Sequence, residues 1–232
     1  MAREAREAAE RRSRRLRTAR NVGLVVVFFV AVFGVISFIT RDNGKKSSST
    51  STTTSPTTVP PKVKLTGFVA DPNKKYTATI QTNFGPIVVA LDSKTAPKAA
   101  GRFIELARGG FYDGLSWHRA AKDFVIQGGR PNGSLGETSG NPPIVGELPK
   151  DHYPVGAVAA AKTPSDPAGT FDSQFFIVTG SKGATLPNDY SLFGHVTSGI
   201  DNAKKIEALA PASGDGTPTK PATIEKITIA ES

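Results

Sequence analysis

The pattern of apolar and polar residues divides this 232-residue chain into four parts. Residues 1–21 are polar and rich in arginine, whereas residues 22–39 form an apolar run without a charged residue. Residues 40–67 are rich in Ser, Thr and Pro, a composition that cannot bury apolar area and predicts a disordered linker. From residue 68 to residue 232, short apolar stretches alternate with Gly- and Pro-rich segments, which predicts one folded domain.

The folded domain begins with a pattern typical of two strands followed by a helix. Residues 77–82 alternate between apolar and polar, and residues 87–91 are continuously apolar, with an Asn-Phe-Gly-Pro turn between them. A helix is predicted to follow, capped by Thr95, with Pro97 in its first turn and Gly-Gly at 109–110 after its end. Its predicted apolar face comprises Ala99, Ala100, Phe103, Ile104 and Ala107.

The rest of the domain consists of short apolar stretches between Gly-, Pro- and Asn-rich loops, with a second helix expected near residues 200–209. Many short strands with few helices are typical of a closed or nearly closed β-barrel that is capped by helices. We therefore expect a mainly β fold.

The formal net charge of +9 is concentrated before this domain. Residues 1–63 contain 12 Lys/Arg and 4 Asp/Glu, so they carry 12 − 4 = +8 and the remaining residues carry +1. A nucleic-acid-binding domain carries its basic surplus on its fold, so no nucleic-acid partner is expected. The chain contains no cysteine, which excludes disulfides, thiolate metal sites and a lipidated cysteine.

The apolar run at residues 22–39 has the length of a transmembrane helix, because a helix of this length spans about 27 Å of a hydrocarbon core of ~30 Å. An uncleaved anchor is favoured over a cleaved signal peptide, since no small-x-small cleavage site follows the run. Eight arginines precede it, against Arg41, Lys45 and Lys46 just after it. The positive-inside bias therefore predicts a single-pass cell-membrane protein with a cytoplasmic N-terminus and an extracytoplasmic domain.

Two segments of the domain carry the candidate chemistry. Residues 117–129 read WHRAAKDFVIQGG, and residues 173–177 read SQFFI. They supply one arginine, two glutamines and several aromatic residues, but no nucleophile–base pair. His118, His152 and His195 lie on separate segments without ligand-like spacing, so neither a metal nor a cofactor is expected. This inventory suits a reaction that reorganises a dipole without making or breaking a bond.

Five motifs of the domain resemble those of the cyclophilins, the peptidyl-prolyl isomerases, in order and spacing. They are the opening hairpin and helix, Phe111-Tyr112-Asp113-Gly114, the Trp-His-Arg to Gln-Gly-Gly run, Ser173-Gln174-Phe175-Phe176 and Leu192-Phe193-Gly194. The resemblance covers roughly residues 68–232. It implies a closed, eight-stranded antiparallel β-barrel capped by two helices, and a monomeric catalytic domain that isomerises proline-containing polypeptides without a metal or cofactor.

Physical chemistry suggests how an arginine could serve this reaction. Amide resonance opposes rotation about the C–N bond by ~18–20 kcal/mol, and in the twisted transition state the proline nitrogen regains a lone pair. A donor aimed at that nitrogen binds the transition state more tightly than either ground state. The resemblance gives this role to Arg119, with Gln127 orienting the guanidinium and Phe124 completing the catalytic set. The alternative for Arg119 is a surface salt bridge with Asp123 or another acid.

The resemblance also implies a set of substrate-binding residues around an apolar proline pocket. They are His118, Val125, Ala161, Lys162, Gln174, Phe176, Leu186 and Tyr190. Phe175 is assigned to the core instead, because it neighbours Phe176 on a strand and points to the opposite face. Val125, Lys162, Thr185 and Tyr190 depart from the commonest cyclophilin pattern, which puts substrate preference in doubt more than activity.

The sequence thus predicts a bacterial, membrane-anchored peptidyl-prolyl isomerase that accelerates the folding of exported proteins. The alternative is a proline-peptide-binding chaperone or scaffold with little catalytic activity. An isomerisation assay distinguishes the two.

Overall fold

The computed structural model describes residues 60–131 and 138–232 of the chain. The basic segment at 1–21, the apolar run at 22–39 and most of the linker lie outside the described residues. Among the helices that are described, none is both long enough and apolar enough to span a membrane.

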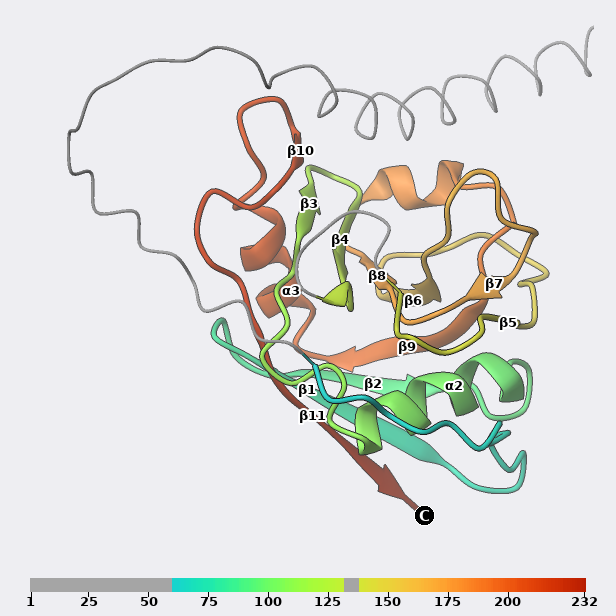
Figure 1. The fold of residues 1–232 in the computed structure, drawn as a ribbon. Helices are drawn as coiled ribbons and strands as arrows, with labels where there is room; N and C mark the ends of the chain where they lie inside the picture. The colour runs from blue at the N-terminus through green and yellow to red at the C-terminus, as the bar shows by residue number, and fades with distance from the viewer. Residues whose placement is uncertain (1–59, 132–137) are drawn as a thin grey trace, which may run out of the picture. The chain divides into compact units, whose positions relative to one another are not determined.

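The described chain forms one large curled sheet, a small two-stranded sheet, two α-helices and one short 3-10 helix (Figure 1). The strands are β1 (Tyr76–Thr82), β2 (Ile87–Leu91), β3 (Arg119–Ala121), β4 (Val125–Gly128), β5 (Ile144–Val145), β6 (Ala157–Ala160), β7 (Thr170–Phe171), β8 (Phe175–Val178), β9 (Leu192–Ser198), β10 (Asp215–Gly216) and β11 (Ile224–Glu231). The helices are α2 (Pro97–Arg108), α3 (Ile200–Glu207) and the 3-10 helix η2 (Ser181–Thr185).

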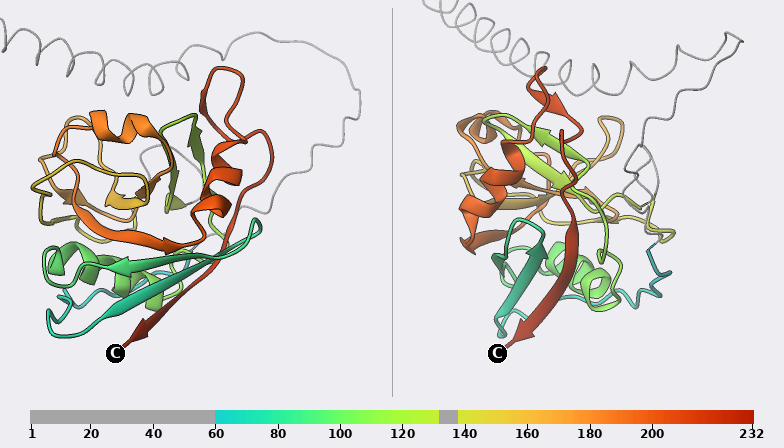
Figure 2. Two further views of the ribbon diagram at one scale, coloured as in Figure 1. Left: turned by 180° about the vertical axis from the view of Figure 1, so that it is seen from behind. Right: turned by 90° about the vertical axis from the view of Figure 1, so that its left-hand side faces the viewer.

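The large sheet is antiparallel throughout, with nine strands in the order β10-β3-β4-β8-β6-β9-β2-β1-β11. Figure 2 shows two further sides of the ribbon, with β11 in dark red beside β1 in teal. The mainly β fold with two α-helices is confirmed within the described residues, but the expected number of eight strands is wrong. The additional strand is β10, which has two residues and forms where a loop folds back onto β3.

The two ends of this sheet, β10 and β11, are not paired with each other as strands in the described structure. The chain just before β3 instead meets the chain just before β11. Ser116 and Thr223 form an isolated bridge, and the N–H of Trp117 donates to the carbonyl of Ala222 at 2.8 Å. The curled sheet is therefore joined across its gap by backbone hydrogen bonds outside the named strands, and not by a closing strand pair.

The opening hairpin and the first helix follow the sequence pattern, except at the helix cap. β1 and β2 coincide with the predicted strands, and α2 runs from Pro97 to Arg108. The prediction that Thr95 caps α2 is wrong, because the N-cap position is Ala96 and has no side-chain cap. The carboxylate of Glu147 accepts hydrogen bonds from the N–H groups of Lys98 and Ala99, at 3.1 and 3.2 Å. A carboxylate is well suited to a helix N-terminus, where N–H groups are unpaired and the helix dipole is positive.

The core lies between α2 and one face of the curled sheet. All five residues of the predicted apolar face of α2 are buried. The Phe103 ring lies 5.1 to 5.3 Å from the rings of Tyr112, Phe175 and Phe193, distances typical of favourable aromatic packing. The second predicted helix is α3, which follows Gly199 and contacts β2, β3 and β4. Helix packing and strand pairing thus hold the strands that carry the candidate site.

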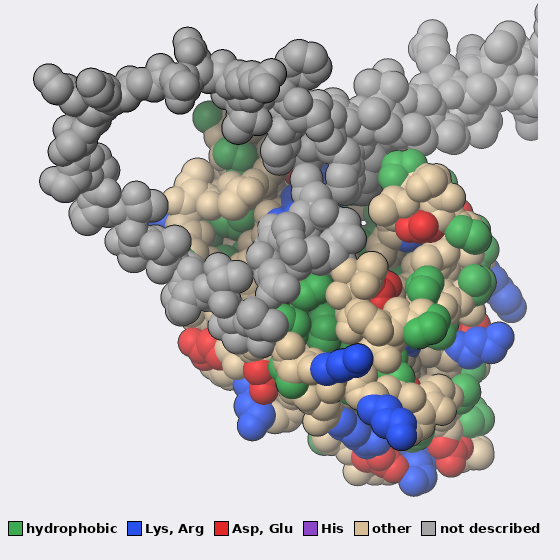
Figure 3. Space-filling view, viewed as in Figure 1, with side chains coloured by type: hydrophobic (Ala, Val, Ile, Leu, Met, Phe, Trp, Pro, Cys, Tyr) green, Lys and Arg blue, Asp and Glu red, His purple; other side chains and the backbone are tan. Residues whose placement is uncertain are grey.

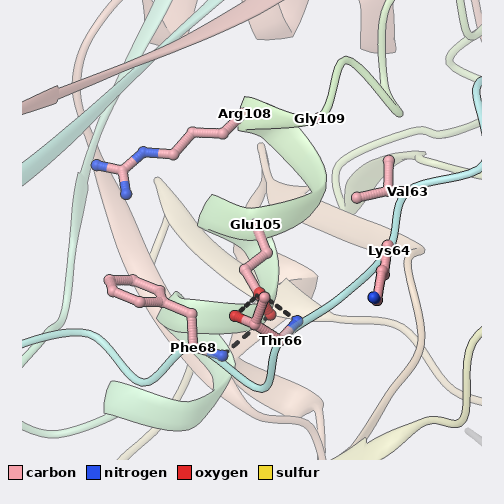
Figure 4. Close-up of a pocket in the computed structure, with 7 residues that line it drawn as sticks. All are labelled: Val63, Lys64, Thr66, Phe68, Glu105, Arg108 and Gly109. Carbon is pink, nitrogen blue, oxygen red and sulfur yellow. Dashed lines mark hydrogen bonds between the residues drawn. The ribbon is translucent and has the colours of Figure 1, made fainter.

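Residues 63–70, which we call the strap, lie along α2 ahead of β1 (Figures 1 and 4). Glu105 of α2 accepts hydrogen bonds from the N–H of Thr66 at 2.7 Å, from its hydroxyl at 2.6 Å, and from the N–H of Phe68 at 3.1 Å. The Arg108 guanidinium lies 5.7 Å from the centre of the Phe68 ring. A pocket between strap and helix is lined by Val63, Lys64, Thr66, Phe68, Glu105, Arg108 and Gly109. The strap therefore attaches the last residues of the predicted linker range to the domain.

Charged side chains of both signs are interspersed on the face of the domain shown in Figure 3. This distribution agrees with the near-neutral composition of the chain after residue 63.

We expect Glu105→Gln to lower the free energy of unfolding by about 1 kcal/mol at neutral pH, because the amide loses the charge that attracts the strap donors. Burial by itself raises the pKa of Glu105, but the hydrogen bonds from Thr66 and Phe68 outweigh it and hold the pKa below its usual 4.5. A lowered carboxyl pKa stabilises the fold above the unfolded-state value, and this contribution disappears as the pH falls through the folded-state pKa. Urea unfolding of residues 60–232 should therefore show a difference in the free energy of unfolding between parent and variant, and this difference should become smaller below about pH 4.5. A difference in the free energy of unfolding that does not change with pH would contradict this explanation.

Candidate active site

Arg119, Gln127 and Phe176 lie in one row across three neighbouring strands. Arg119 on β3 is paired with Gln127 on β4, and Gln127 is paired with Phe176 on β8. Directly opposed residues of antiparallel strands project from the same face of a sheet. The row continues to Ala159 on β6. The strand register therefore brings together, on one face, side chains that are far apart in the sequence.

The other face of the same strands packs on the core. Ala120, Ile126 and Ile177, which are the sequence neighbours of the row, all belong to the main hydrophobic cluster. Phe175 belongs to it as well, and its ring lies 5.5 Å from that of Trp117. The prediction that Phe175 is a core residue is confirmed. One face of the sheet thus stabilises the fold, while the opposite face carries the candidate site.

The guanidinium of Arg119 is held by two side chains from two neighbouring strands. Its Nε donates to Oδ1 of Asp215 at 2.7 Å, and its Nη2 donates to Oδ2 of Asp215 at 2.6 Å. Its Nη1 donates to Oε1 of Gln127 at 3.3 Å, and the Phe124 ring centre lies 5.7 Å from the guanidinium carbon. The Nε2 of Gln127 in turn donates to Oε1 of Gln174 at 3.0 Å. Both glutamines predicted from the sequence therefore belong to the network that fixes the arginine.

Asp215 is the residue of this network that sequence reasoning missed. The suggested salt-bridge partner, Asp123, accepts hydrogen bonds from Ser181 instead, with a backbone N–H contact of 2.8 Å. The Arg119–Asp215 ion pair is also not a surface salt bridge, since the two side chains are only 10% and 5% exposed. The only signal in the sequence was an acid between two glycines shortly before the last strand. That pattern does not show that Asp215 lies beside β3.

Phe124, Val125, Phe176 and Tyr190 lie on the same side of the sheet as Arg119. Phe124, Val125, Phe176, Leu186 and Tyr190 are each at most 9% exposed, and none belongs to the main hydrophobic cluster. The Phe176 ring meets Tyr190 edge-on at 5.5 Å. Tyr153, which was not predicted, lies 6.2 Å from Phe176, and its hydroxyl donates to the carbonyl of Tyr190 at 2.8 Å. The buried tyrosine thus fixes the backbone of Tyr190.

The segment after β6 lies beside this apolar group. The N–H of Ala161 donates to the carbonyl of Gln174 at 2.8 Å. The Lys162 side chain is only 3% exposed, with its ammonium 2.8 Å from a carboxylate oxygen of Asp189 and 5.5 Å from the Tyr190 ring centre. Thr185 ends η2 and is exposed. Lys162 and Tyr190, two of the departures from the usual cyclophilin pattern, therefore contact each other.

His118 is buried next to Arg119 in the chain and stays neutral at physiological pH. Burial, followed by the charges of Arg130 and Arg119, lowers the pKa of His118 to about 3, although a hydrogen bond with Gln174 opposes the shift. Within residues 60–131 and 138–232, no three His, Cys, Asp or Glu side chains form a group that could hold a metal ion.

This arrangement presents a fixed N–H donor beside an apolar surface, which can orient a peptide and stabilise a changing dipole. A curled antiparallel sheet with two helices and such a site agrees with the proline-isomerase class that the sequence motifs predict. Over residues 77–229 the chain matches the cyclophilin type peptidyl-prolyl cis-trans isomerases, and it belongs to this family. The chain is therefore a peptidyl-prolyl cis-trans isomerase.

Curated relatives and solved structures agree with this assignment. The chain is 37% identical to peptidyl-prolyl cis-trans isomerase cypE of Dictyostelium discoideum, over 57% of this chain and 85% of the relative. It is 35% identical to peptidyl-prolyl cis-trans isomerase A of Mycobacterium tuberculosis, over 66% of this chain and 91% of the relative. The crystal structure of a cyclophilin type isomerase of Cryptosporidium parvum superposes with a TM-score of 0.61 at 27% identity, over 67% of this chain and 98% of that chain.

We expect His118 to remain neutral from pH 8 to below pH 5, because the buried ring would lose its hydration and face two guanidinium groups on protonation. The unfolded chain binds this proton near pH 6.5 while the folded chain does not. Domain stability should therefore fall as the pH decreases from 6.5 towards 3. A ¹³C NMR titration of the ring carbons measures the pKa, and His118→Gln identifies the resonance. A midpoint near 6.5 would show that the ring is hydrated.

Proposed function

We propose that this isomerase lowers the barrier to X-Pro rotation by stabilising the twisted amide with Arg119. The observation that carries the proposal is the fixed guanidinium, which Asp215 and Gln127 hold beside the Phe124 ring. An arginine stays protonated at all physiological pH values and offers N–H donors in a rigid plane. Such a donor needs no reorganisation when the transition state forms, which is the condition for effective electrostatic stabilisation.

The substrate is a polypeptide whose proline ring occupies the apolar group of Phe124, Val125, Phe176, Leu186 and Tyr190. Gln174, Ala161, Lys162 and His118 would hold the residues that precede the proline, with the N–H of Lys162 donating to the preceding carbonyl. A solved structure of the Cryptosporidium parvum isomerase in the presence of the dipeptide Ala-Pro, 28% identical with a TM-score of 0.60, supports this substrate class.

The reaction itself requires no proton transfer. As the C–N bond twists, resonance is lost and the proline nitrogen becomes pyramidal with a localised lone pair. An N–H of Arg119 donates to this lone pair, which is absent from both planar ground states, so the interaction lowers the barrier. The surrounding apolar side chains exclude water, which strengthens the hydrogen bond because the local dielectric is low.

Arg119→Ala should lower kcat/KM by roughly two to three orders of magnitude, or about 3–4 kcal/mol of transition-state stabilisation. Arg119→Lys keeps the charge but loses the planar fork, so most of the loss should remain. Both variants are assayed with a short X-Pro peptide, and circular dichroism checks the fold because Asp215 loses its buried partner. A folded Arg119→Ala variant with the parental rate would remove Arg119 from the mechanism.

We further propose that the protein is a bacterial single-pass membrane protein that serves exported polypeptides. The uncharged run at residues 22–39 would be the anchor, and the arginine-rich residues 1–21 would stay in the cytoplasm. The support is the charge asymmetry around the run and the near-neutral composition of the domain. The catalytic domain would act as a monomer, on polypeptides alone.

Anchoring would suit this role for two reasons: uncatalysed X-Pro isomerisation is slow, and the linker has a short span. X-Pro bonds interconvert in tens to hundreds of seconds without a catalyst, which is slow compared with the folding of most domains. A flexible linker over residues 40–62, ahead of the strap, would have a root-mean-square span of roughly 25 Å, so the domain would stay close to the membrane. Polypeptides that emerge there would meet a high local concentration of catalyst.

Protease added to intact spheroplasts should release the catalytic domain by cleavage within residues 44–62, because the linker lacks the composition to fold. An antibody against the domain detects the released fragment of the full-length protein. A cytoplasmic marker that stays intact is the control for membrane integrity. A domain that is protected until the membrane is permeabilised would refute the proposed topology.

A further inference from the structure

We propose that Asp215 is a positioning residue for Arg119, which sets the plane in which the guanidinium meets the proline nitrogen. This inference rests on the role proposed for Arg119 and adds the residue that fixes the orientation of its N–H donors. The structure points to it through three independent features: the contacts of the ion pair, its burial, and the loop that carries the carboxylate.

The contacts leave the guanidinium little freedom to rotate. Both oxygens of Asp215 accept from the Nε and Nη2 edge of Arg119, at 2.7 and 2.6 Å. A bidentate pair of this kind fixes the guanidinium plane as well as its position, which a single hydrogen bond cannot do. Gln127 accepts from Nη1 at 3.3 Å on the other side of the group. All three nitrogens of the Arg119 guanidinium thus donate to a side-chain acceptor.

Burial makes this pair an effective constraint. The Arg119 and Asp215 side chains are only 10% and 5% exposed, so water competes weakly for their hydrogen bonds. The carboxylate also offsets the charge of the guanidinium. Arg119 would therefore act on the substrate through a directed, short-range hydrogen bond more than through long-range attraction. Removal of Asp215 should accordingly affect kcat, which depends on the direction of the donor, more than KM.

The loop that carries Asp215 is built onto the strand that carries Arg119. Asp215 pairs with Ala121 of β3, and the N–H of Lys122 donates to the carbonyl of Gly214 at 2.8 Å. Gly214 and Gly216 have φ angles of +86° and +147°, which residues with a side chain rarely adopt. Figure 1 shows β10 beside β3, at the end of the loop that follows α3. The carboxylate is consequently held in register with Arg119 by backbone contacts that do not involve the substrate.

A purely structural role is the competing explanation, in which the ion pair only fastens β10 to β3. The backbone pairing of β10 already provides such an attachment, and it would survive replacement of the side chain. The two explanations differ in what accompanies a loss of activity. A positioning role lowers kcat in Asp215→Ala while β10 stays paired with β3, which slow exchange of the Lys122 N–H reports, whereas a structural role lowers kcat only where that pairing is lost.

The test uses the full-length protein with Asp215→Ala, Asp215→Asn and Asp215→Glu, each alone and with Arg119→Ala. We expect Asp215→Ala to lower kcat about ten- to thirtyfold with KM within about twofold, since a misdirected donor loses transition-state contact. Asp215→Asn and Asp215→Glu keep an acceptor and should lose less. In the Arg119→Ala background, Asp215→Ala should change kcat/KM by less than about twofold. Asp201→Asn, at an exposed position of α3, is the control for an equal change in net charge.

NMR provides a readout that does not depend on turnover. The Nε–H resonance of Arg119 should be protected from solvent exchange in the parent and lose that protection in Asp215→Ala. If Asp215→Ala does not fold, Asp215→Asn decides the question by the same two measurements.

A folded variant that keeps both the parental kcat and the Nε–H protection overturns the inference, as does an equal loss of activity with and without Arg119. If Arg119→Ala itself leaves the rate unchanged, the proposed function fails, and the inference fails with it. If Arg119→Ala abolishes activity while the Asp215 variants keep it, only the inference fails.

Discussion

The antiparallel register of β3, β4 and β8 is the constraint on which the rest of the site depends. It places Arg119, Gln127 and Phe176 in one row, and it turns their sequence neighbours towards the core. Because side chains alternate along a strand, a shift of one residue in this register would exchange the two sets. The guanidinium would then enter the core, and the core residues would face solvent. Packing against α2 therefore protects the geometry of the site as well as the stability of the fold.

Burial of a cation imposes a second constraint on the site. A guanidinium that is 10% exposed must be paired, because an unpaired buried charge costs several kcal/mol. Asp215 meets this requirement, and its bidentate geometry restricts the orientation of the group at the same time. Gln127 and Gln174 extend the network without adding charge. The cost of burying Arg119 is thus offset by contacts that also direct its donors.

The composition, periodicity and motifs of the chain were sufficient to identify the family and to predict the two α-helices and the first two strands. The alternation in β1, the apolar β2 and the apolar face of α2 are local properties, and they agree with the structure because each segment buries one defined face. The motif spacing also placed Arg119, Gln127, Gln174 and Phe176 in one site. Phe175 was assigned correctly to the core by strand alternation alone.

Only the tertiary structure decided which distant residues cap, bind or pair with these local elements. Glu147 caps α2 in place of Thr95, Glu105 binds the strap, and Asp215 pairs with Arg119. Each contact joins residues that are tens of positions apart, so no local pattern contains it. The ninth strand has the same origin, since β10 exists only where its loop meets β3. The sequence by itself determined the first two strands, the two α-helices and the side chains that could do the chemistry, because those properties depend on near neighbours. The partners that orient them depend on the path of the whole chain.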